Sequence, residues 1–394
     1  MKILISHFGR YKKDGWGRTF SLGEGLAALG HDVTLLCSSN EKKKLYDRLP
    51  INGVKVIVFY DFIPQKLLSS GYGCISFICR MLFSIFHKFE IVHSDSHRPS
   101  SYYPCIINKK LYGSLYFIEW WDNFEAQSKN AKTRKWYKQF LIRRDAKAEI
   151  STKIVADGCI VMSKILLRKG TEIGMPLHKL KIIHGGSNIK QLRLLPLGYC
   201  KEKLGLKHKT LTFGYIGSGD ADYSDLDVLF DAILSLIPNY DIKFLNYGRP
   251  FKKCVDSIPA LKNVIIECGW VDYYQDPSLL AATDIFVLTK LDNVVNNSGW
   301  PSKFGDYLAC GRPVILNLYG ELIDFCRVYN PGVIEVAFEV PDIVKKIKDI
   351  CSGKYDLLQM GNTNRIIAEQ HSWLQKSREL EQFYLDIKSN SFPG

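Results

Sequence analysis

The sequence has 394 residues, enough for two or three domains, and its 46% hydrophobic and 24% charged residues are normal for a soluble globular protein. The eleven cysteines form no CxxC pair, and the histidines and cysteines lack zinc-binding spacing, which excludes a zinc module. Scattered thiols, and an N-terminus without the apolar region of a signal peptide, lead us to expect a cytoplasmic protein.

The formal net charge of +13 calls for an anionic partner or substrate. Residues 129–147 hold eight Lys and Arg against the single Asp145, interleaved with aromatic residues. This pattern suits the surface of an anionic bilayer, and equally a solvated amphipathic helix. Residues 75–86 are very apolar but contain Arg80, and they are shorter than the about 20 residues of a membrane span, so we expect a buried helix with one edge touching lipid. Beyond charge there is no nucleic-acid-binding motif, and we expect no nucleic-acid partner.

The first elements along the chain form a βαβ unit. Residues 1–6 indicate a strand, residues 7–18 a loop that includes Gly17, residues 19–29 a helix and residues 32–37 a second strand. This order predicts a parallel sheet with crossover helices. A dinucleotide-binding domain begins in the same way, but its GxGxxG fingerprint requires a tight turn, whereas this loop is basic and about a dozen residues long.

Two later strands of the first half end in polar residues. Residues 90–93 are followed by His97, and residues 114–119 are followed by Trp-Trp-Asp122. Side chains just beyond the C-terminal end of a parallel strand lie where ligands bind in α/β sheets. His97 is therefore a catalytic candidate, with a purely structural histidine as the alternative.

The second half begins with three further strands, at residues 210–216, 242–247 and 264–267. Gly217, Arg249 and Val271 lie in the turns that follow them. The acidic loop after the first of these strands contains Asp220-Ala-Asp222, which imitates a metal-binding DxD motif. We interpret this loop as solvated and expect no metal.

Residues 283–316 are the most informative stretch. They indicate a strand, a loop rich in Asn and Ser, and a short helix, at residues 285–288, 292–298 and 302–310. A helix entered through such a loop presents free backbone N–H groups and a positive dipole end, which suit a diphosphate. Lys303 adds a cation, and Asp306, one turn further on, is placed to accept hydrogen bonds from a ribose diol.

Within this stretch, GWPSKFGDYLACGRPVI resembles the C-terminal donor signature of the family-4 retaining glycosyltransferases, which have the GT-B fold, and GEGLAALGHDVTLL is similar to their first helix and second strand. The resemblance implies an α/β fold of two Rossmann-like domains that face each other across a cleft. We accordingly expect an acceptor-binding domain at residues 1–195 and a nucleotide-sugar-binding domain at residues 196–371. A C-terminal helix within residues 372–394 should cross back to the first domain.

The resemblance also implies site residues. In the family, two Glu residues are eight positions apart; the second, which binds the ribose, corresponds to Asp306, and the first corresponds to Ser298, so that carboxylate is absent. A strand end that often reads His-Asp in the family reads Trp-Trp-Asp here, which makes Asp122 a catalytic candidate beside His97. The residues expected to contact the donor are Gly17, Gly217, Arg249, Val271, Asn293, Asn296, Asn297, Ser298, Gly299, Lys303 and Asp306.

The activity implied is transfer of a hexose-type sugar from a UDP- or GDP-linked donor to a glycan or lipid-linked glycan, with retention and without metal or other cofactor. A bacterial surface-polysaccharide pathway fits, with the protein cytoplasmic or peripheral on the anionic inner membrane face. Two alternatives stay open: a UDP-sugar epimerase of GT-B fold, and a non-catalytic sugar-nucleotide-binding relative, which the missing Glu and His suggest.

Overall fold

The protein is described from a computed structural model that covers residues 1–41, 45–61, 70–123, 126 and 136–391. The chain divides into two compact units. Unit 1 comprises Met1–Gly185, Ser298–Trp300 and Trp373–Gly394, and unit 2 comprises Gly186–Asn297 and Pro301–Ser372. The compact units thus divide between Gly185 and Gly186, while the domain ranges expected from the sequence stay predictions.

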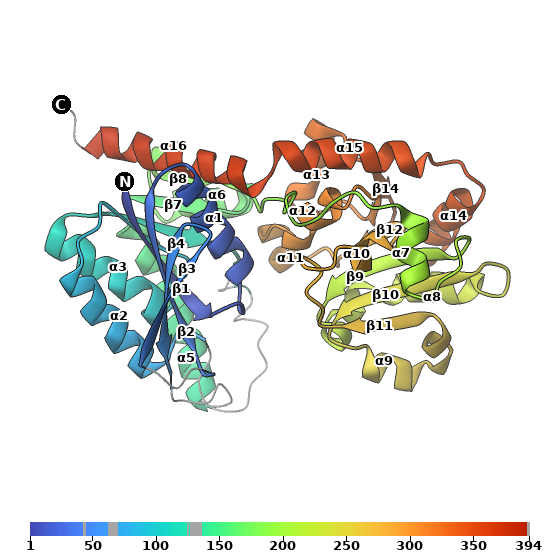
Figure 1. Ribbon diagram of the computed structural model, residues 1–394, viewed down its shortest axis with the longest axis horizontal. Coiled ribbons are helices and arrows are strands. Elements are labelled where there is room, and N and C mark those ends of the chain that lie inside the picture. The colour runs from blue at the N-terminus through green and yellow to red at the C-terminus, as the bar shows by residue number, and fades with distance from the viewer. Residues whose placement is uncertain (42–44, 62–69, 124–125, 127–135, 392–394) are drawn as a thin grey trace. The chain divides into compact units, whose positions relative to one another are not determined.

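Unit 1 is built around an eight-stranded sheet with the order β3-β4-β2-β1-β5-β6-β7-β8 (Figure 1). Its strands are β1 (Lys2–Arg10), β2 (Asp32–Ser39), β3 (Tyr46–Ile51), β4 (Val54–Tyr60), β5 (Ile91–Ser94), β6 (Leu115–Trp120), β7 (Gly158–Val161) and β8 (Leu180–Ile182). Its helices are α1 (Trp16–Ala28), α2 (Cys74–Phe86), α3 (Pro99–Tyr112), α5 (Trp136–Ile154), α6 (Lys164–Glu172), the 3-10 helix η1 (Leu177–Lys179) and α16 (Trp373–Ser391). All described strand pairs are parallel except β3 with β4. The central strands are buried along their length because helices cover both faces of a parallel sheet.

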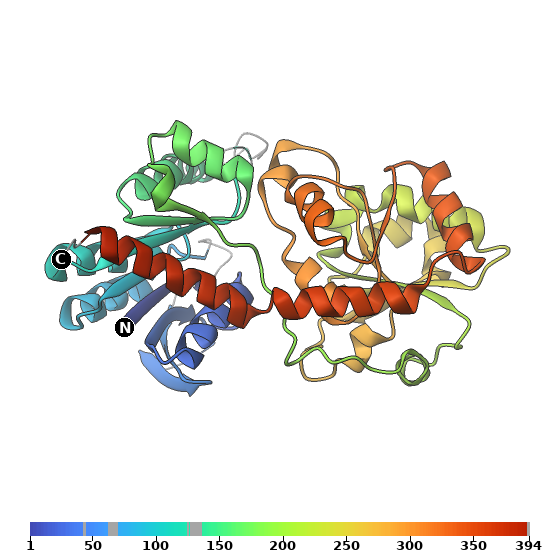
Figure 2. The same ribbon diagram turned by 90° about the horizontal axis from the view of Figure 1, so that it is seen from above.

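Helix α16 packs on α1, so the C-terminal helix returns to the N-terminal unit as expected (Figure 2). Ser377 Oγ on α16 donates a hydrogen bond of 3.2 Å to the Leu22 carbonyl on α1. The two helices approach closely because Gly25 has no side chain, and an added Cβ would overlap Ser377. Further along α16, Lys388 forms an ion pair of 2.9 Å with Glu90.

Unit 2 holds a six-stranded parallel sheet with the order β11-β10-β9-β12-β13-β14. Its strands are β9 (Leu211–Gly217), β10 (Ile242–Gly248), β11 (Ile265–Gly269), β12 (Ile285–Leu288), β13 (Val314–Leu316) and β14 (Val333–Glu335). Its helices are α7 (Leu197–Lys203), η2 (Gly219–Asp225), α8 (Asp227–Leu236), α9 (Lys252–Ser257), η3 (Pro259–Asn263), α10 (Ser278–Ala281), α11 (Val294–Ser298), α12 (Ser302–Ala309), α13 (Glu321–Tyr329), α14 (Val340–Cys351) and α15 (Leu357–Gln370). The strand order reverses between β9 and β12, which is where ligands bind in open α/β sheets.

Three local expectations were wrong. Strand β1 continues to Arg10, beyond the expected end at residue 6. Helix α1 begins at Trp16, so Gly17 lies in its first turn and not in a loop. Strand β3 was not expected, and part of the loop at residues 292–298 is the short helix α11. Each change extends regular structure into polar sequence, where backbone pairing outweighs side-chain composition.

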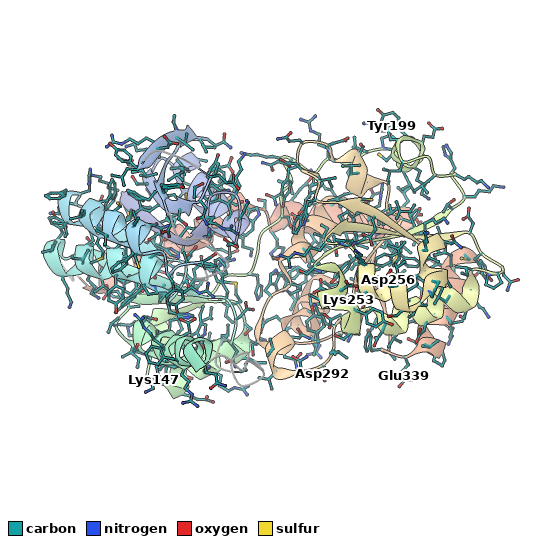
Figure 3. The ribbon with its side chains drawn as sticks, turned by 90° about the horizontal axis from the view of Figure 1, so that it is seen from below. Lys147, Tyr199, Lys253, Asp256, Asp292 and Glu339 are labelled. Atoms are coloured by element: carbon teal, nitrogen blue, oxygen red, sulfur yellow. The ribbon has the colours of Figure 1, made fainter. Side chains whose placement is uncertain are left out.

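The basic segment at residues 129–147 is described only in part. Residues 129–135 lie outside the described part of the chain, and α5 begins at residue 136. Lys147, labelled in Figure 3, is exposed on α5. Within the described residues, no helix combines the length and the apolar character that crossing a bilayer requires.

Candidate active site

Helix α12 is fixed on the sheet of unit 2 by one aromatic stack. The Tyr307 ring lies parallel to the Phe286 ring of β12, with centroids 4.2 Å apart. Its hydroxyl accepts a hydrogen bond of 3.0 Å from the Ile216 amide of β9. The residue before the helix is Pro301, whose side chain makes no capping hydrogen bond, so no cap side chain competes for the first-turn N–H groups. The N-terminus of α12 thus has no side-chain cap, and the anion site expected there stays a prediction.

Lys303, in the first turn of α12, lies over an aromatic face. Its Nζ is 3.8 Å from the centroid of the Tyr215 ring, and the Tyr215 hydroxyl donates a hydrogen bond of 2.9 Å to Asp222 Oδ2. Burial, followed by the neighbouring Lys290, lowers the pKa of Lys303 to about 7. The ammonium is thus held in place but poorly compensated, a state that a bound phosphate would relieve.

Glycine at the end of β9 gives Tyr215 its position. A Cβ at Gly217 would overlap the Tyr215 ring and lie 2.6 Å from Asp222 Oδ2. The Gly217 carbonyl accepts a hydrogen bond of 3.2 Å from the Arg249 amide, which draws the turn after β10 against β9. The Arg249 side chain is exposed.

The acidic loop after β9 is not merely solvated, which corrects our interpretation. Asp220 accepts hydrogen bonds of 3.0 and 3.1 Å from backbone amides of α9, and Asp222 accepts one of 2.6 Å from the Ser218 amide. Asp225 pairs with Lys290 at 2.5 Å. These carboxylates hold the loop through internal donors. In the part of the chain that the structure covers, no group of three or more His, Cys, Asp or Glu side chains is placed to hold a metal ion.

Asp306, the expected ribose ligand, is nearly buried and already accepts three hydrogen bonds. Its Oδ1 accepts one of 2.8 Å from Asn188, and its Oδ2 accepts one of 2.7 Å from Tyr274 and one of 3.4 Å from Tyr273. Burial raises the pKa of Asp306 to about 6, although these hydrogen bonds oppose the shift. A ribose diol would therefore have to share this carboxylate with the two tyrosines. The sequence analysis missed both, although they follow the turn at Val271, which is half-buried after β11.

The three asparagines of the segment organise α11. Asn293 Oδ1 accepts a hydrogen bond of 2.9 Å from the Asn296 amide, Asn296 Nδ2 donates one of 2.8 Å to the Leu291 carbonyl, and Asn297 Nδ2 donates one of 2.7 Å to Asp292. Asn297 Oδ1 is buried and has no hydrogen-bond partner among the described residues. An orphaned buried acceptor costs free energy unless a ligand or water donates to it.

Ser298–Trp300, the middle of the expected donor segment, belongs to unit 1 together with Asp122. The Ser298 carbonyl accepts a hydrogen bond of 2.6 Å from Ser163 Oγ, which also caps α6. A Cβ at Gly299 would lie 3.0 Å from Asp122 Oδ1. The structure therefore brings Asp122 next to Gly299, although the two are far apart in the sequence.

A buried network holds the backbone just before Asp122. Trp121 Nε1 donates a hydrogen bond to Glu119, and Glu119 also accepts one of 2.7 Å from Arg18 Nε. Burial opposes ionisation of Glu119, but Arg18 and then His93 outweigh it and lower the pKa of this carboxyl to about 2. The ionised Glu119 thus fixes Trp121 and the start of the loop that carries Asp122.

His97, the second catalytic candidate, is buried, and its Nε2 lies 3.7 Å from Asp145 Oδ1. Burial, with nearby Lys153 and Arg98, lowers its pKa well below the usual value, so the ring is neutral at pH 7. Gly17 is exposed on α1, and an added Cβ would meet no described heavy atom within 4 Å. The roles expected for both residues stay predictions.

Comparison with known proteins gives one family match and several solved structures of similar fold. Residues 210–352 match the family described as "Glycosyl transferases group 1". No curated protein matches the sequence of this chain. Sucrose-phosphate synthase from Thermosynechococcus elongatus is similar with a TM-score of 0.75 at 13% identity, over 99% of this chain and 100% of that one. Anabaena HepE in complex with UDP and glucose has a TM-score of 0.70 at 13% identity, over 97% and 98% of the two chains. WaaG, a glycosyltransferase involved in lipopolysaccharide biosynthesis, has a TM-score of 0.70 at 12% identity, over 96% and 98%.

The fold is therefore the GT-B fold of these solved structures. Both units have the parallel α/β sheets of that fold, and the expected fold class is confirmed. The resemblance to the group 1 glycosyltransferases is confirmed over residues 210–352. At such low identity, the solved structures show the fold and not the donor or the acceptor.

Proposed function

We propose that the protein transfers a hexose-type sugar from a UDP- or GDP-linked donor to a glycan or lipid-linked glycan, with retention and without metal or other cofactor. One observation carries the proposal. The segment that matches the group 1 glycosyltransferases contains the uncapped N-terminus of α12, with Lys303 held over Tyr215 in its first turn. That combination is suited to a diphosphate.

The donor would be held by complementary groups of unit 2. The first-turn amides of α12 and the Lys303 ammonium would bind the diphosphate, with the exposed Arg249 as a further cation. The unpartnered Asn297 Oδ1 would accept a hydrogen bond from a sugar hydroxyl. Asp306 would share its carboxylate with a ribose hydroxyl. HepE has been solved with UDP and glucose, which supports a UDP-linked hexose.

The chemical step exchanges one C–O bond for another. The acceptor hydroxyl oxygen forms a bond to the anomeric carbon, and the bond between that carbon and the donor phosphate oxygen breaks. The electron pair of the broken bond stays on the diphosphate, where Lys303 and the α12 dipole stabilise it. The departing phosphate oxygen takes the proton of the acceptor, so no side-chain base is required, and Asp122 orients the acceptor hydroxyl.

A membrane-linked acceptor is favoured by charge. The chain carries a net charge of +13, and WaaG acts in lipopolysaccharide biosynthesis. We therefore place the protein on the cytoplasmic side, at the anionic inner face of a membrane, in a surface-polysaccharide pathway with no nucleic-acid partner.

Donor turnover tests the proposal. A thermal-shift screen with UDP-, GDP- and ADP-sugars first identifies the donor, because a ligand that binds the folded state raises the melting temperature. Slow release of nucleoside diphosphate from that donor is then expected. Conversion to an epimer would indicate the epimerase instead, and binding without any turnover would indicate a non-catalytic relative.

A further inference from the structure

Helix α2 of unit 1 is amphipathic, but its polar face is buried and its apolar face is exposed. Its fully buried residues are polar, namely Ser76, Arg80 and Ser84. Arg80 is 0% exposed and donates hydrogen bonds to Ser76 Oγ at 3.0 Å and to the Ser100 carbonyl at 3.1 Å. A charged side chain has thus been desolvated toward the inside of the unit.

The outward face of the same helix is apolar. Ile78 is 55% exposed, Leu82 49% and Phe86 75%. Scattered apolar residues are normal on a protein surface, but these three recur at helical spacing on one side. Contiguous exposed apolar surface marks a binding face for a protein or a membrane.

This face borders a groove of about 260 Å³ between α2 and the β3–β4 hairpin. The residues that line it are Leu45, Tyr46, Arg48, Ile57, Phe59, Cys79, Leu82, Phe83 and Phe86. In the antiparallel register, Tyr46 lies opposite Phe59, and Arg48 lies opposite Ile57. Of the lining residues, Ile57 and Phe59 are buried, whereas Tyr46 and Leu82 are exposed.

The charge around the groove selects an anionic occupant. Arg48 is the one charged residue that lines it in the described structure, and its guanidinium lies 5.7 Å from the Tyr46 ring centroid. Lys88, which follows α2, is exposed. A second copy of a chain with a net charge of +13 would be repelled here.

We propose that α2 and the β3–β4 hairpin dock on an anionic phospholipid bilayer, with a lipid acyl chain in the groove and the lipid phosphate on Arg48. An apolar face bordered by cations is the arrangement by which interfacial helices bind anionic lipids. The inference deepens the proposed membrane-linked acceptor and rests on it only for the biological setting, because lipid docking does not depend on donor chemistry.

Co-sedimentation with vesicles of equal parts phosphatidylglycerol and phosphatidylcholine tests the proposal. The parent protein should bind these vesicles, and binding should weaken in raised salt and on phosphatidylcholine alone. The double variant Leu82→Ser/Phe86→Ser should bind at least about tenfold more weakly, because it removes the exposed apolar groups that the lipid would bury. Arg48→Gln should lose about fivefold, the contribution of one cation near an anionic surface.

Val328→Ser is the matched control, since Val328 is 70% exposed on α13 of unit 2, and it should bind vesicles like the parent. Melting temperatures establish that each variant is folded. Parent binding that the groove variants leave unchanged, or no vesicle binding at all, would overturn the proposal. A parent protein that is dimeric in solution and becomes monomeric in the groove variants would also overturn the proposal. Release of nucleoside diphosphate, measured without vesicles, should be the same in all variants, and its absence in the parent would overturn the proposed reaction while leaving the lipid result to stand.

Discussion

The pKa of Lys303 makes donor affinity depend on pH in a defined direction. Burial and the nearby Lys290 lower this pKa from 10.5 to about 7. Below pH 7 the side chain is an ammonium ready to bind phosphate. Above pH 7 the free protein has lost that proton, and a diphosphate can recover the charge-assisted contact only by proton uptake.

The size of the effect follows from the charged fraction. Between pH 6.5 and 8.5, the protonated fraction of a group with a pKa near 7 falls roughly twentyfold, so the donor Kd should rise on the order of twentyfold. Without ligand, the stability of the fold changes in the opposite direction. Between pH 7 and 10.5 the lysine is protonated in the unfolded chain and largely deprotonated in the folded one. Lys303 therefore makes the free energy of unfolding increase as pH rises from 7 to 10.5.

Isothermal titration calorimetry with the donor found by thermal shift checks this prediction. Measured at pH 8.5 in two buffers of different ionisation enthalpy, the parent should take up close to one proton on binding. Lys303→Met should bind about ten- to a hundredfold more weakly at pH 6.5, the value of a lost charged hydrogen bond, and should take up no proton. Lys303→Arg keeps its charge throughout, so its affinity should not change with pH. A parent Kd that is constant from pH 6.5 to 8.5 would refute the reasoning.

Three further predictions concern single residues. Asp122→Asn should lower sugar transfer at least about a hundredfold in a single-turnover assay with little change in melting temperature, and near-normal transfer would remove Asp122 from the scheme. Asp306→Ala removes the acceptor of Tyr274 and one of the two acceptors of Asn188, so the free energy of unfolding measured in urea should fall by about 1–3 kcal/mol and donor affinity should drop, whereas an unchanged affinity would exclude the ribose role. Gly217→Ala should cost about 1–3 kcal/mol in the same urea titration because its Cβ overlaps Tyr215, while Gly17→Ala, which meets nothing, should be neutral or stabilising by up to about 1 kcal/mol; equal costs would contradict the packing argument.

Much of the fold could be predicted because buried parallel strands leave a strong local signal. The apolar runs that became β9, β10 and β12 were identified within a residue or two. The fold class then followed from the strand and helix order together with the donor signature.

Strand β3 and helix α11 could not be predicted in the same way. The β3 segment contains Pro50 and the adjacent charged residues Asp47 and Arg48, and it lies at an edge of the sheet, where exposure removes the apolar signal. Helix α11 is held by Asn293 and Asn296 side chains, which are typical of loops until their hydrogen-bond partners are known.

The contacts between side chains in the site could not be predicted from the sequence, for another reason. Lys303 was recognised as a cation, but the Tyr215 ring beneath it comes from a different strand. Asp306 was recognised as a carboxylate, but its hydrogen bonds to Tyr274 and Asn188 join segments that are remote in the chain. No periodic pattern specifies which side chains of separate elements come into contact.

The most direct test of the account is a crystal structure of the protein with its nucleoside diphosphate bound. The account predicts phosphate oxygens within hydrogen-bond distance of the first-turn amides of α12 and of the Lys303 ammonium. A diphosphate bound away from α12, with the Lys303 ammonium making no contact to a phosphate oxygen, would contradict the central claim.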